Sequence, residues 1–265
     1  MRVFLNNLCE GRAMKKICIA SRDNRFLYAK ELFDKNGYLC KICKTEDVDY
    51  PDALVLSPRL EHDDANLRCL AKGVRDDTVI FTGQGEKIKA YFKGRVIDYS
   101  ENESYLLKNA YITAQCAIKL TYERLTYPVY GKRALVIGYG RIGKYLASTL
   151  KSLGAVVFVY ARREESRVDA HLNGMGILSE LSLETAESLD LVYNTVPYRI
   201  VDKSVSDGLK GDALVMELAS APGGFEDENI ALKAPALPGR MMPKEAGKAI
   251  FDLIDSYLRL NMKGK

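Results

Sequence analysis

Short apolar runs alternate with helix-like segments along the first hundred residues. The runs predict four strands, at Lys16–Ala20, Leu39–Cys43, Ala53–Leu56 and Thr78–Phe81. Between the first two, Asn24–Asn36 mixes apolar and polar faces as a helix does, and Gly37 ends it. Strands that alternate with helices predict βαβ units and a parallel sheet. We therefore expect residues 14–102 to form a flavodoxin-like α/β domain that binds substrate or a partner.

The rest of the chain predicts a long helix and a second set of strands. An apolar stripe over Glu103–Leu125 indicates a helix that links two domains, within residues 103–127. Buried parallel strands are then predicted at Lys132–Ile137, Ala155–Tyr160, Asp190–Val196 and Asp212–Leu218. They define a second domain at residues 128–242. The last helix, Lys244–Leu260, has one broad apolar face, so we expect residues 243–262 to pack back toward the first domain.

A glycine motif connects the first strand of the second domain to a helix. It reads Gly138, Tyr139, Gly140, Arg141, Ile142, Gly143. In such a turn the first glycine permits a tight bend, the second lets the backbone approach a pyrophosphate, and the third lets the helix close on the strand. The free N–H groups at the helix start then bind phosphate. A turn without a ligand would explain one glycine but not three at this spacing, so we predict a Rossmann NAD(P)-binding domain.

The end of the next strand indicates which dinucleotide is bound. An acid there holds the ribose 2′-OH of NAD, whereas arginine accommodates the 2′-phosphate of NADP. Here the strand runs into Ala161, Arg162 and Arg163, with no acid at its end. The alternative is a pair of solvated surface arginines. We predict NADP, bound by all three residues.

Two further strand ends are expected at the same cofactor. In an open α/β sheet the carboxyl ends of the strands line the ligand crevice. The residues concerned are Asn194, Thr195, Val196 and Pro197 after one strand, and Ala219 and Ser220 after the next. We predict that they bracket the nicotinamide, although turns rich in proline and glycine also close many strands that bind nothing.

Composition places the chain among globular proteins with reduced thiols. Hydrophobic residues make up 47% of the chain and charged residues 28%, which is the balance of a globular protein. Its length of 265 residues is enough for two domains of ordinary size. A net charge of +4 from 39 basic and 35 acidic residues suggests no nucleic-acid partner, and no apolar run approaches the ~18 residues of a membrane span. Residues 1–13 do not look like a secretory signal, and Met14 looks like the natural start.

The cysteines carry no strong chemical signal. Six are scattered along the chain, which predicts reduced thiols in a cytosol. Cys40 and Cys43 have the spacing of a redox or metal pair, but we interpret them as two thiols of a short strand. The chain has only two histidines, and no metal site is expected.

Several segments of the second half recur in one known family. They are the glycine loop, the Ala161–Arg162 strand end, Asn194–Pro197, Glu217–Gly224 and Leu237–Gly247. Together and in this order they resemble the family of dipicolinate synthase A subunits, from about Asn102 to the end of the chain. Related loops occur across the 2-hydroxyacid dehydrogenase superfamily, and the first domain resembles the family only loosely.

The resemblance implies an NADP-dependent oxidoreductase. Its reaction would convert a tetrahydrodipicolinate-type intermediate of the lysine pathway to pyridine-2,6-dicarboxylate, the spore chelator. Loss of water gives a dihydropyridine dicarboxylate, and aromatisation then favours hydride transfer to NADP⁺. The implied setting is the cytosol of the mother cell of a sporulating bacterium. The implied partners are the dipicolinate synthase B subunit and further copies of the chain, as a homo-oligomer.

The resemblance also implies substrate residues, and the chain departs from the family at some of them. In the linking helix, Asn109 and Thr113 keep the family pattern, but Gln115 replaces a glutamate, and a glutamine cannot act as a general base. Arg240, in the last shared segment, is implied as a substrate ligand. The family's Gly-Gly-Asp-x-Arg turn after the first strand appears as Ser21–Arg25.

Three charged residues remain candidates on their own chemistry. Lys244 and Asp23 are candidates for proton transfer, and the Arg25 guanidinium is a candidate to bind a substrate carboxylate. Exposed charges more often only solvate a surface.

Two other functions are compatible with the same residues. The first is a different NADP-dependent dehydrogenase, acting on another small cyclic or 2-hydroxy acid, because a fold and a cofactor do not fix a substrate. The second is a regulatory protein that binds NADP but has lost turnover, which the changes at Gln115 and Arg22 suggest. Activity on such acids without a second subunit would favour the first function. Normal NADP binding with no product, even with the B subunit present, would favour the second.

Overall fold

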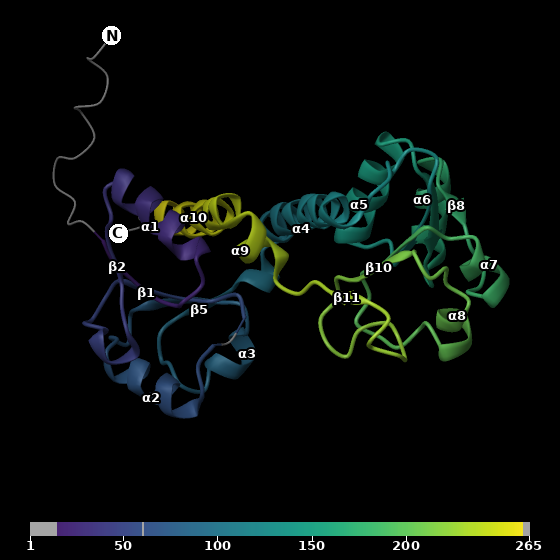
Figure 1. Ribbon diagram of the computed structural model, residues 1–265. Coiled ribbons are helices and arrows are strands. Elements are labelled where there is room, and N and C mark those ends of the chain that lie inside the picture. Colours follow the sequence, from purple (N-terminus) through teal and green to yellow (C-terminus); the bar gives the residue numbers. More distant parts are fainter. Residues whose placement is uncertain (1–14, 60, 262–265) are drawn as a thin grey trace, which may run out of the picture. The chain divides into compact units, whose positions relative to one another are not determined.

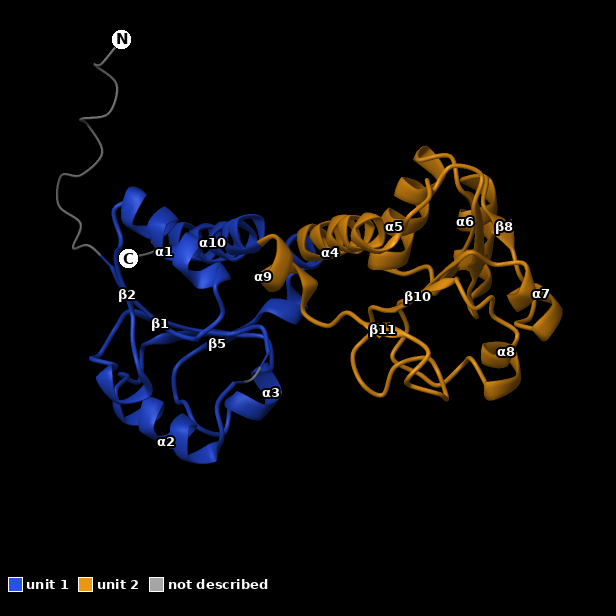
Figure 2. Ribbon diagram, viewed as in Figure 1, with its two compact units in different colours: residues 1–106, 243–265 blue, residues 107–242 orange. Residues whose placement is uncertain are grey.

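The computed structural model describes residues 15–59 and 61–261, so the start expected at Met14 lies outside the described residues. Within them the chain divides into two compact units (Figure 2). Unit 1 consists of the described residues up to Leu106 together with those from Pro243 onward. Unit 2 consists of Leu107–Met242.

Unit 1 is built on a parallel sheet of five strands in the order β2-β1-β3-β4-β5 (Figure 1). The strands are β1 Lys16–Ala20, β2 Leu39–Ile42, β3 Ala53–Leu56, β4 Val79–Thr82 and β5 Val96–Asp98. This is the strand order of flavodoxin-like folds, which confirms the fold predicted for the first domain. Its helices are α1 Arg25–Lys35, α2 Asp64–Lys72, α3 Gly85–Ile88 and α10 Pro243–Leu260.

Helices cover both faces of this sheet. On one face, Leu67 and Leu70 of α2 and Ile88 of α3 share a buried cluster with strand residues such as Leu54. On the other face lie α1 and α10 (Figure 1), where the Phe33 and Phe251 rings stand 5.1 Å apart, edge to face. These two helices approach closely because α10 carries a glycine, Gly247, at their contact. A Cβ atom at this position would collide with the backbone of α1.

Unit 2 is built on a second parallel sheet, of six strands, in the order β11-β10-β9-β6-β7-β8. The strands are β6 Arg133–Ile137, β7 Val156–Tyr160, β8 Gly176–Ile177, β9 Leu191–Asn194, β10 Leu214–Glu217 and β11 Leu232–Lys233. Counted along the chain, the order is that of a Rossmann dinucleotide-binding sheet. The order reverses between β6 and β9, which is where such folds bind their ligand.

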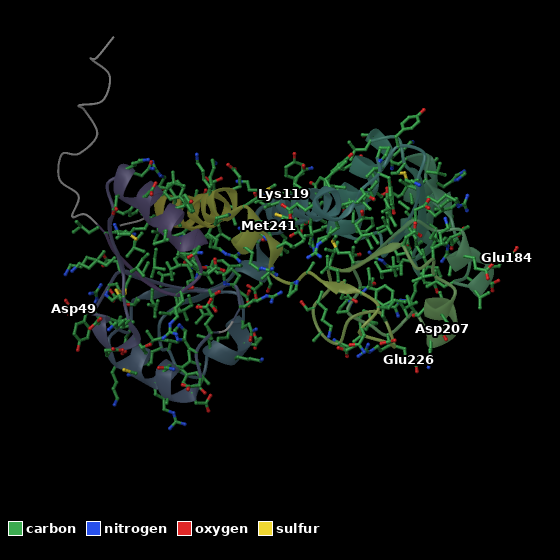
Figure 3. All side chains as sticks on the ribbon, in the orientation of Figure 1. Asp49, Lys119, Glu184, Asp207, Glu226 and Met241 are labelled. Carbon is green, nitrogen blue, oxygen red and sulfur yellow. A yellow bond between two sulfur atoms is a disulfide. The ribbon has the colours of Figure 1, made fainter. Side chains whose placement is uncertain are left out.

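The helices of unit 2 bury the apolar faces of this sheet. They are α4 Glu103–Arg124, which begins in unit 1, α5 Arg141–Ser152, α6 Glu164–Leu172, α7 Leu183–Glu187, α8 Lys203–Asp207 and α9 Leu237–Met241. Ala186 of α7 and Val205 of α8 pack with Leu135 and Ile137 of β6. In each unit, side chains fill the space between sheet and helices (Figure 3). Among the described residues, no helix is long and apolar enough to cross a membrane.

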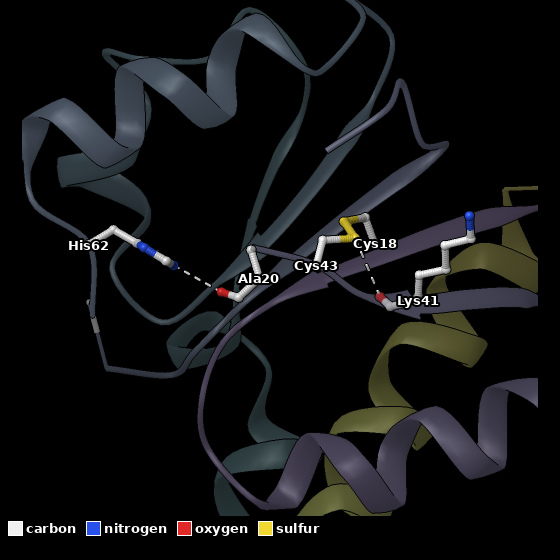
Figure 4. Close-up of a disulfide and its surroundings, with 5 residues drawn as sticks. All are labelled: Cys18, Ala20, Lys41, Cys43 and His62. Carbon is white, nitrogen blue, oxygen red and sulfur yellow. Dashed lines mark hydrogen bonds between the residues drawn. A yellow bond between two sulfur atoms is a disulfide. The ribbon is translucent and has the colours of Figure 1, made fainter. Parts of the chain in front are cut away.

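Two cysteines of unit 1 differ from the expectation of reduced thiols, whereas Cys40 and Cys69 are free. A disulfide joins Cys18 of β1 to Cys43, just past the end of β2, with their Cα atoms 6.2 Å apart (Figure 4). These two positions meet because β1 and β2 are paired neighbours in the sheet. Cys40 is a free, buried thiol, and burial raises its pKa to about 12. Cys40 and Cys43 are therefore not bonded to each other.

Candidate functional site

The glycine loop has the shape that a dinucleotide turn requires. Gly138 adopts a left-handed φ of 93°, and a side chain there would lie 2.5 Å from the Thr195 hydroxyl. A side chain on Gly143 would collide with the carbonyl oxygen of Gly138, so this glycine lets α5 close on the loop. Tyr139 is buried, and its burial raises the pKa of the phenol, so this ring packs as a neutral side chain.

Gly140 differs from the other two glycines. It is exposed, and a Cβ built on it would have no protein atom within 4 Å. It directly precedes α5, a helix of 12 residues that starts at Arg141 and continues through Ile142. The protein therefore leaves open the place beside a helix N-terminus where a pyrophosphate would bind. The residues fit an NAD(P) cofactor.

The end of β7 presents two arginines with different surroundings. The Arg162 guanidinium lies over the ring of Tyr198, 5.0 Å from its centroid. Arg163, like Arg162, is exposed, and it precedes the first residue of α6. Arg167 lies one turn later and donates through Nη1 to the carbonyl oxygens of Ala161, at 3.2 Å, and Arg162, at 2.7 Å. Its sequence position gave no hint that it holds the end of the strand.

The end of β9 is tied to the glycine loop. The Thr195 hydroxyl donates to the carbonyl oxygen of Ile137 at 2.9 Å, directly before Gly138. Val196 is half-buried, and Pro197 is exposed. Asn194 is fully buried, and its amide donates to Val196 O at 2.8 Å and to a carboxylate of β10. The Asn194 side chain is thus used within the protein, and its backbone carbonyl accepts from the Leu218 N–H at 2.9 Å.

The end of β10 holds a residue whose role the sequence did not reveal. Glu217 is 9% exposed, and its carboxylate accepts hydrogen bonds from the Asn194 amide and from two backbone N–H groups. Ala219, half-buried, and Ser220, exposed, follow it. The signal for Glu217 was weak because an acid at a strand end is common; only its burial makes it notable.

In unit 1, two predicted site residues form an ion pair after β1. Arg25 Nη2 lies 2.8 Å from Asp23 Oδ2, and both side chains are largely buried. The Arg25 Nε atom has no hydrogen-bond partner among the described residues. A buried guanidinium with one unused N–H group suits an anion such as a carboxylate.

The same strand end gathers two residues that local sequence patterns did not indicate. His62 Nε2 lies 2.9 Å from the carbonyl oxygen of Ala20, although 42 residues separate them in the chain (Figure 4). Glu61 accepts hydrogen bonds from the Ser21 hydroxyl at 3.0 Å and from the Arg22 N–H at 3.1 Å. The end of β1 therefore carries a histidine and a second acid beside the ion pair described above.

The other predicted residues lie on helices. In α4, Asn109 and Gln115 are half-buried, while the buried Thr113 donates its hydroxyl hydrogen to the carbonyl oxygen of Asn109 at 2.7 Å. Arg240 of α9 is exposed and donates to Pro235 O at 3.3 Å. These four residues belong to unit 2, whereas Lys244, exposed at the start of α10, belongs to unit 1 with Asp23 and Arg25.

Known proteins are similar to this chain both in the nucleotide-binding domain alone and over a longer part of the sequence. The family model described as D-isomer specific 2-hydroxyacid dehydrogenase, NAD binding domain, matches residues 109–215. Over 194 residues the chain is 32% identical to the dipicolinate synthase A subunit of Bacillus subtilis (strain 168), and the match covers 68% of this chain and 64% of that protein. The chain is a homologue of the dipicolinate synthase A subunit. The match spans a little under two thirds of the relative's own length.

Two solved structures extend the likeness over nearly the whole chain. Dipicolinate synthase, A chain, from Bacillus subtilis gives a TM-score of 0.78 at 23% identity and covers 96% of this chain and 99% of that chain. The corresponding protein from Bacillus halodurans gives 0.77 at 22% identity and covers 92% and 98%. This homologue thus has the same fold in the first domain, where its sequence resembles the family least. Its second domain is an NAD(P)-binding domain of the dehydrogenase type.

Proposed function

We propose that this homologue works as the A subunit of a dipicolinate synthase. The proposed reaction is the NADP-dependent oxidation of a tetrahydrodipicolinate-type intermediate to pyridine-2,6-dicarboxylate, with a B subunit of the same synthase as partner, in the mother-cell cytosol of a sporulating bacterium. The identity to the Bacillus subtilis relative over 68% of the chain supports the choice of reaction. A homo-oligomer remains part of the proposal.

The cofactor proposal rests on one observation, the open side of Gly140 at the start of α5. Backbone N–H groups there would bind the pyrophosphate, with Gly138 and Gly143 fixing the loop. Arg162 and Arg163 would bind the 2′-phosphate, because guanidinium groups donate paired hydrogen bonds to phosphate and no acid competes at the strand end. The residues after β9 and β10 would lie at the nicotinamide.

The chemistry divides between binding, hydride transfer and proton release. Loss of a hydroxyl as water from the intermediate leaves a dihydropyridine dicarboxylate. This ring must then lose one hydride and one proton to become aromatic. The chemistry that bound NADP⁺ would supply is acceptance of this hydride. Because the hydride moves only between aligned atoms, the protein has to orient one ring C–H bond and hold both carboxylates.

Named residues can take these roles. Arg25 would bind one carboxylate through its guanidinium group, and Asp23 would keep the guanidinium in place. Arg240, Asn109 and Thr113 would contact the substrate. Lys244 and Asp23 would be the groups that move protons, while Gln115 would only hydrogen-bond.

The decisive experiment is a product assay. Pyridine-2,6-dicarboxylate would be measured by its absorbance after incubating the lysine-pathway intermediate with the protein, with NADP⁺ or NAD⁺, and with or without a homologue of the B subunit. We expect product with NADP⁺ when the B subunit is present. Omitting the intermediate controls for background absorbance, and the absence of product from a protein that binds NADP⁺ would refute the reaction.

Gln115 supports a second candidate function. If the family's glutamate at that position moves a proton, a glutamine there leaves an NADP-binding protein without turnover. Such a protein would regulate or assemble with an enzyme. The same assay separates the two functions, because a regulatory protein binds NADP⁺ normally and forms no product even with the B subunit.

A further inference from the structure

A buried carboxylate lies at the carboxyl end of β10. Glu217 Oε1 accepts from the Asn194 amide at 2.7 Å and from the Ala219 N–H at 2.9 Å. Glu217 Oε2 accepts from the Gly224 N–H at 2.7 Å and from the same amide at 3.0 Å. Burying an anion costs several kcal/mol unless its oxygens are fully hydrogen-bonded, and here both oxygens are.

These bonds close the loop of residues 219–224. One carboxylate fastens both ends of the loop, because Ala219 and Gly224 are its first and last residues. The loop fits tightly around the carboxylate. A side chain on Gly223 would lie 2.8 Å from Glu217 Oε2, and one on Gly224 would collide with the Asn194 amide. The middle of the loop, Ser220, Ala221 and Pro222, is exposed.

The network reaches the glycine loop through Asn194. The Asn194 side chain exchanges hydrogen bonds with the backbone of Val196, donating at 2.8 Å and accepting at 3.2 Å. The Val196 Cγ1 atom lies 2.6 Å from the position that a Cβ on Gly138 would occupy, so Val196 packs directly against this glycine. A polar network thus holds the ends of β9 and β10 together, and Val196 packs beside the glycine loop that follows β6, at the switch point of the sheet.

We propose that Glu217 is a positioning residue for the nicotinamide half of the cofactor. By fastening the loop of residues 219–224, it sets Ser220 and Ala221 against that half, whereas the glycine loop and the end of β7 bind the adenosine diphosphate half. Only a carboxylate can accept from both loop ends and from an amide together; a glutamine would turn its own N–H groups toward one of those donors. The inference rests on the proposed dinucleotide binding and holds for either NAD⁺ or NADP⁺.

The test compares a whole dinucleotide with a fragment that lacks nicotinamide. Isothermal titration would give the Kd of NADP⁺ and of 2′-phospho-ADP-ribose, or of NAD⁺ and ADP-ribose if only NAD⁺ binds. We expect wild type to bind the dinucleotide about tenfold more tightly, as for one well-formed hydrogen bond to the nicotinamide end. In E217Q this ratio should fall to within about twofold of unity, with the fragment's Kd unchanged.

Thr121→Val is the matched control. It removes another buried polar contact of unit 2, the 2.7 Å hydrogen bond between the Thr121 and Tyr193 hydroxyls, next to Asn194 in β9. T121V should lower the Tm and keep the wild-type ratio. Should E217Q fail to fold, G224A replaces it, since the added methyl group displaces the loop from Asn194 and leaves the carboxylate in place.

Each remaining outcome refutes a distinct statement. A wild-type ratio near one, or an E217Q ratio like that of T121V, would overturn the positioning role while dinucleotide binding stands. Equal weakening of both ligands in E217Q would show that Glu217 serves only stability. If wild type bound neither dinucleotide, the proposed cofactor itself would be wrong, and this inference would fall with it.

Discussion

At the scale of single residues, the arginines near the end of β7 make different contacts. Arg167 donates to two backbone carbonyls and so completes the end of β7. Arg162 instead lies over the Tyr198 ring. Stacking uses the face of a guanidinium and leaves its in-plane N–H groups to donate to a phosphate. The two residues nearest the strand end are therefore the ones to test for cofactor choice.

Replacing Arg162 and Arg163 with alanine should change cofactor preference. We expect R162A/R163A to weaken NADP⁺ binding far more than NAD⁺ binding, by about 1.5 to 3 kcal/mol for each charged hydrogen bond lost. Titration calorimetry with both cofactors measures this. R68A, which removes an exposed arginine from α2 of unit 1, is the control for charge and should change neither Kd. An equal loss for both cofactors would contradict the 2′-phosphate assignment.

Residues whose role depends on backbone shape could be predicted, and residues whose role depends on distant partners could not. The glycine loop was recognisable because its shape depends on residues that lack a Cβ atom, and glycines can be read directly from the sequence. Glu217 and His62 were not recognised, because the Asn194 amide that binds Glu217 and the Ala20 carbonyl that contacts His62 lie 23 and 42 residues away. The disulfide between Cys18 and Cys43 was missed for the same reason, since it joins neighbouring strands rather than neighbouring residues.

At the scale of elements, central strands were predicted closely, whereas the edge strands β5, β8 and β11 were missed. β1, β3 and β6 are buried on nearly every residue, so each stands out as an apolar run. The edge strand β11 has two residues, and in α6 only Ser166 and Ala170 are buried. Elements at an edge contact too little of the core to require a recognisable apolar pattern.

Two glycines of one turn should respond differently to alanine. G140A should keep the wild-type Tm, because the added methyl group meets open space in the protein, yet it should abolish dinucleotide binding by occupying the place of the pyrophosphate. G143A should lower the Tm, because its methyl group collides with the Gly138 carbonyl. Thermal unfolding and cofactor titration on both variants measure this. Wild-type affinity in G140A would show that the cofactor does not cross this loop.

At the scale of the whole molecule, unit 1 is assembled from two distant parts of the chain, whereas unit 2 is continuous. The helix α10, from the end of the chain, packs on α1 near its start, with ring contacts of Phe251 on Phe33 and of Tyr257 on Phe81. Each unit keeps its own buried core. The stability of unit 1 should therefore depend on α10, while the dinucleotide site of unit 2 should not.

Phe251→Ala tests this separation. Truncating a buried aromatic side chain costs about 3 to 5 kcal/mol, so F251A should unfold unit 1 at a lower urea concentration. The Kd for the dinucleotide should stay within about twofold of wild type, because every residue assigned to the cofactor belongs to unit 2. L260A, at a residue of the same helix that is 74% exposed, should change neither quantity. A large loss of cofactor affinity in F251A alone would show that the nucleotide site depends on unit 1, and that the two units do not fold as separate structures.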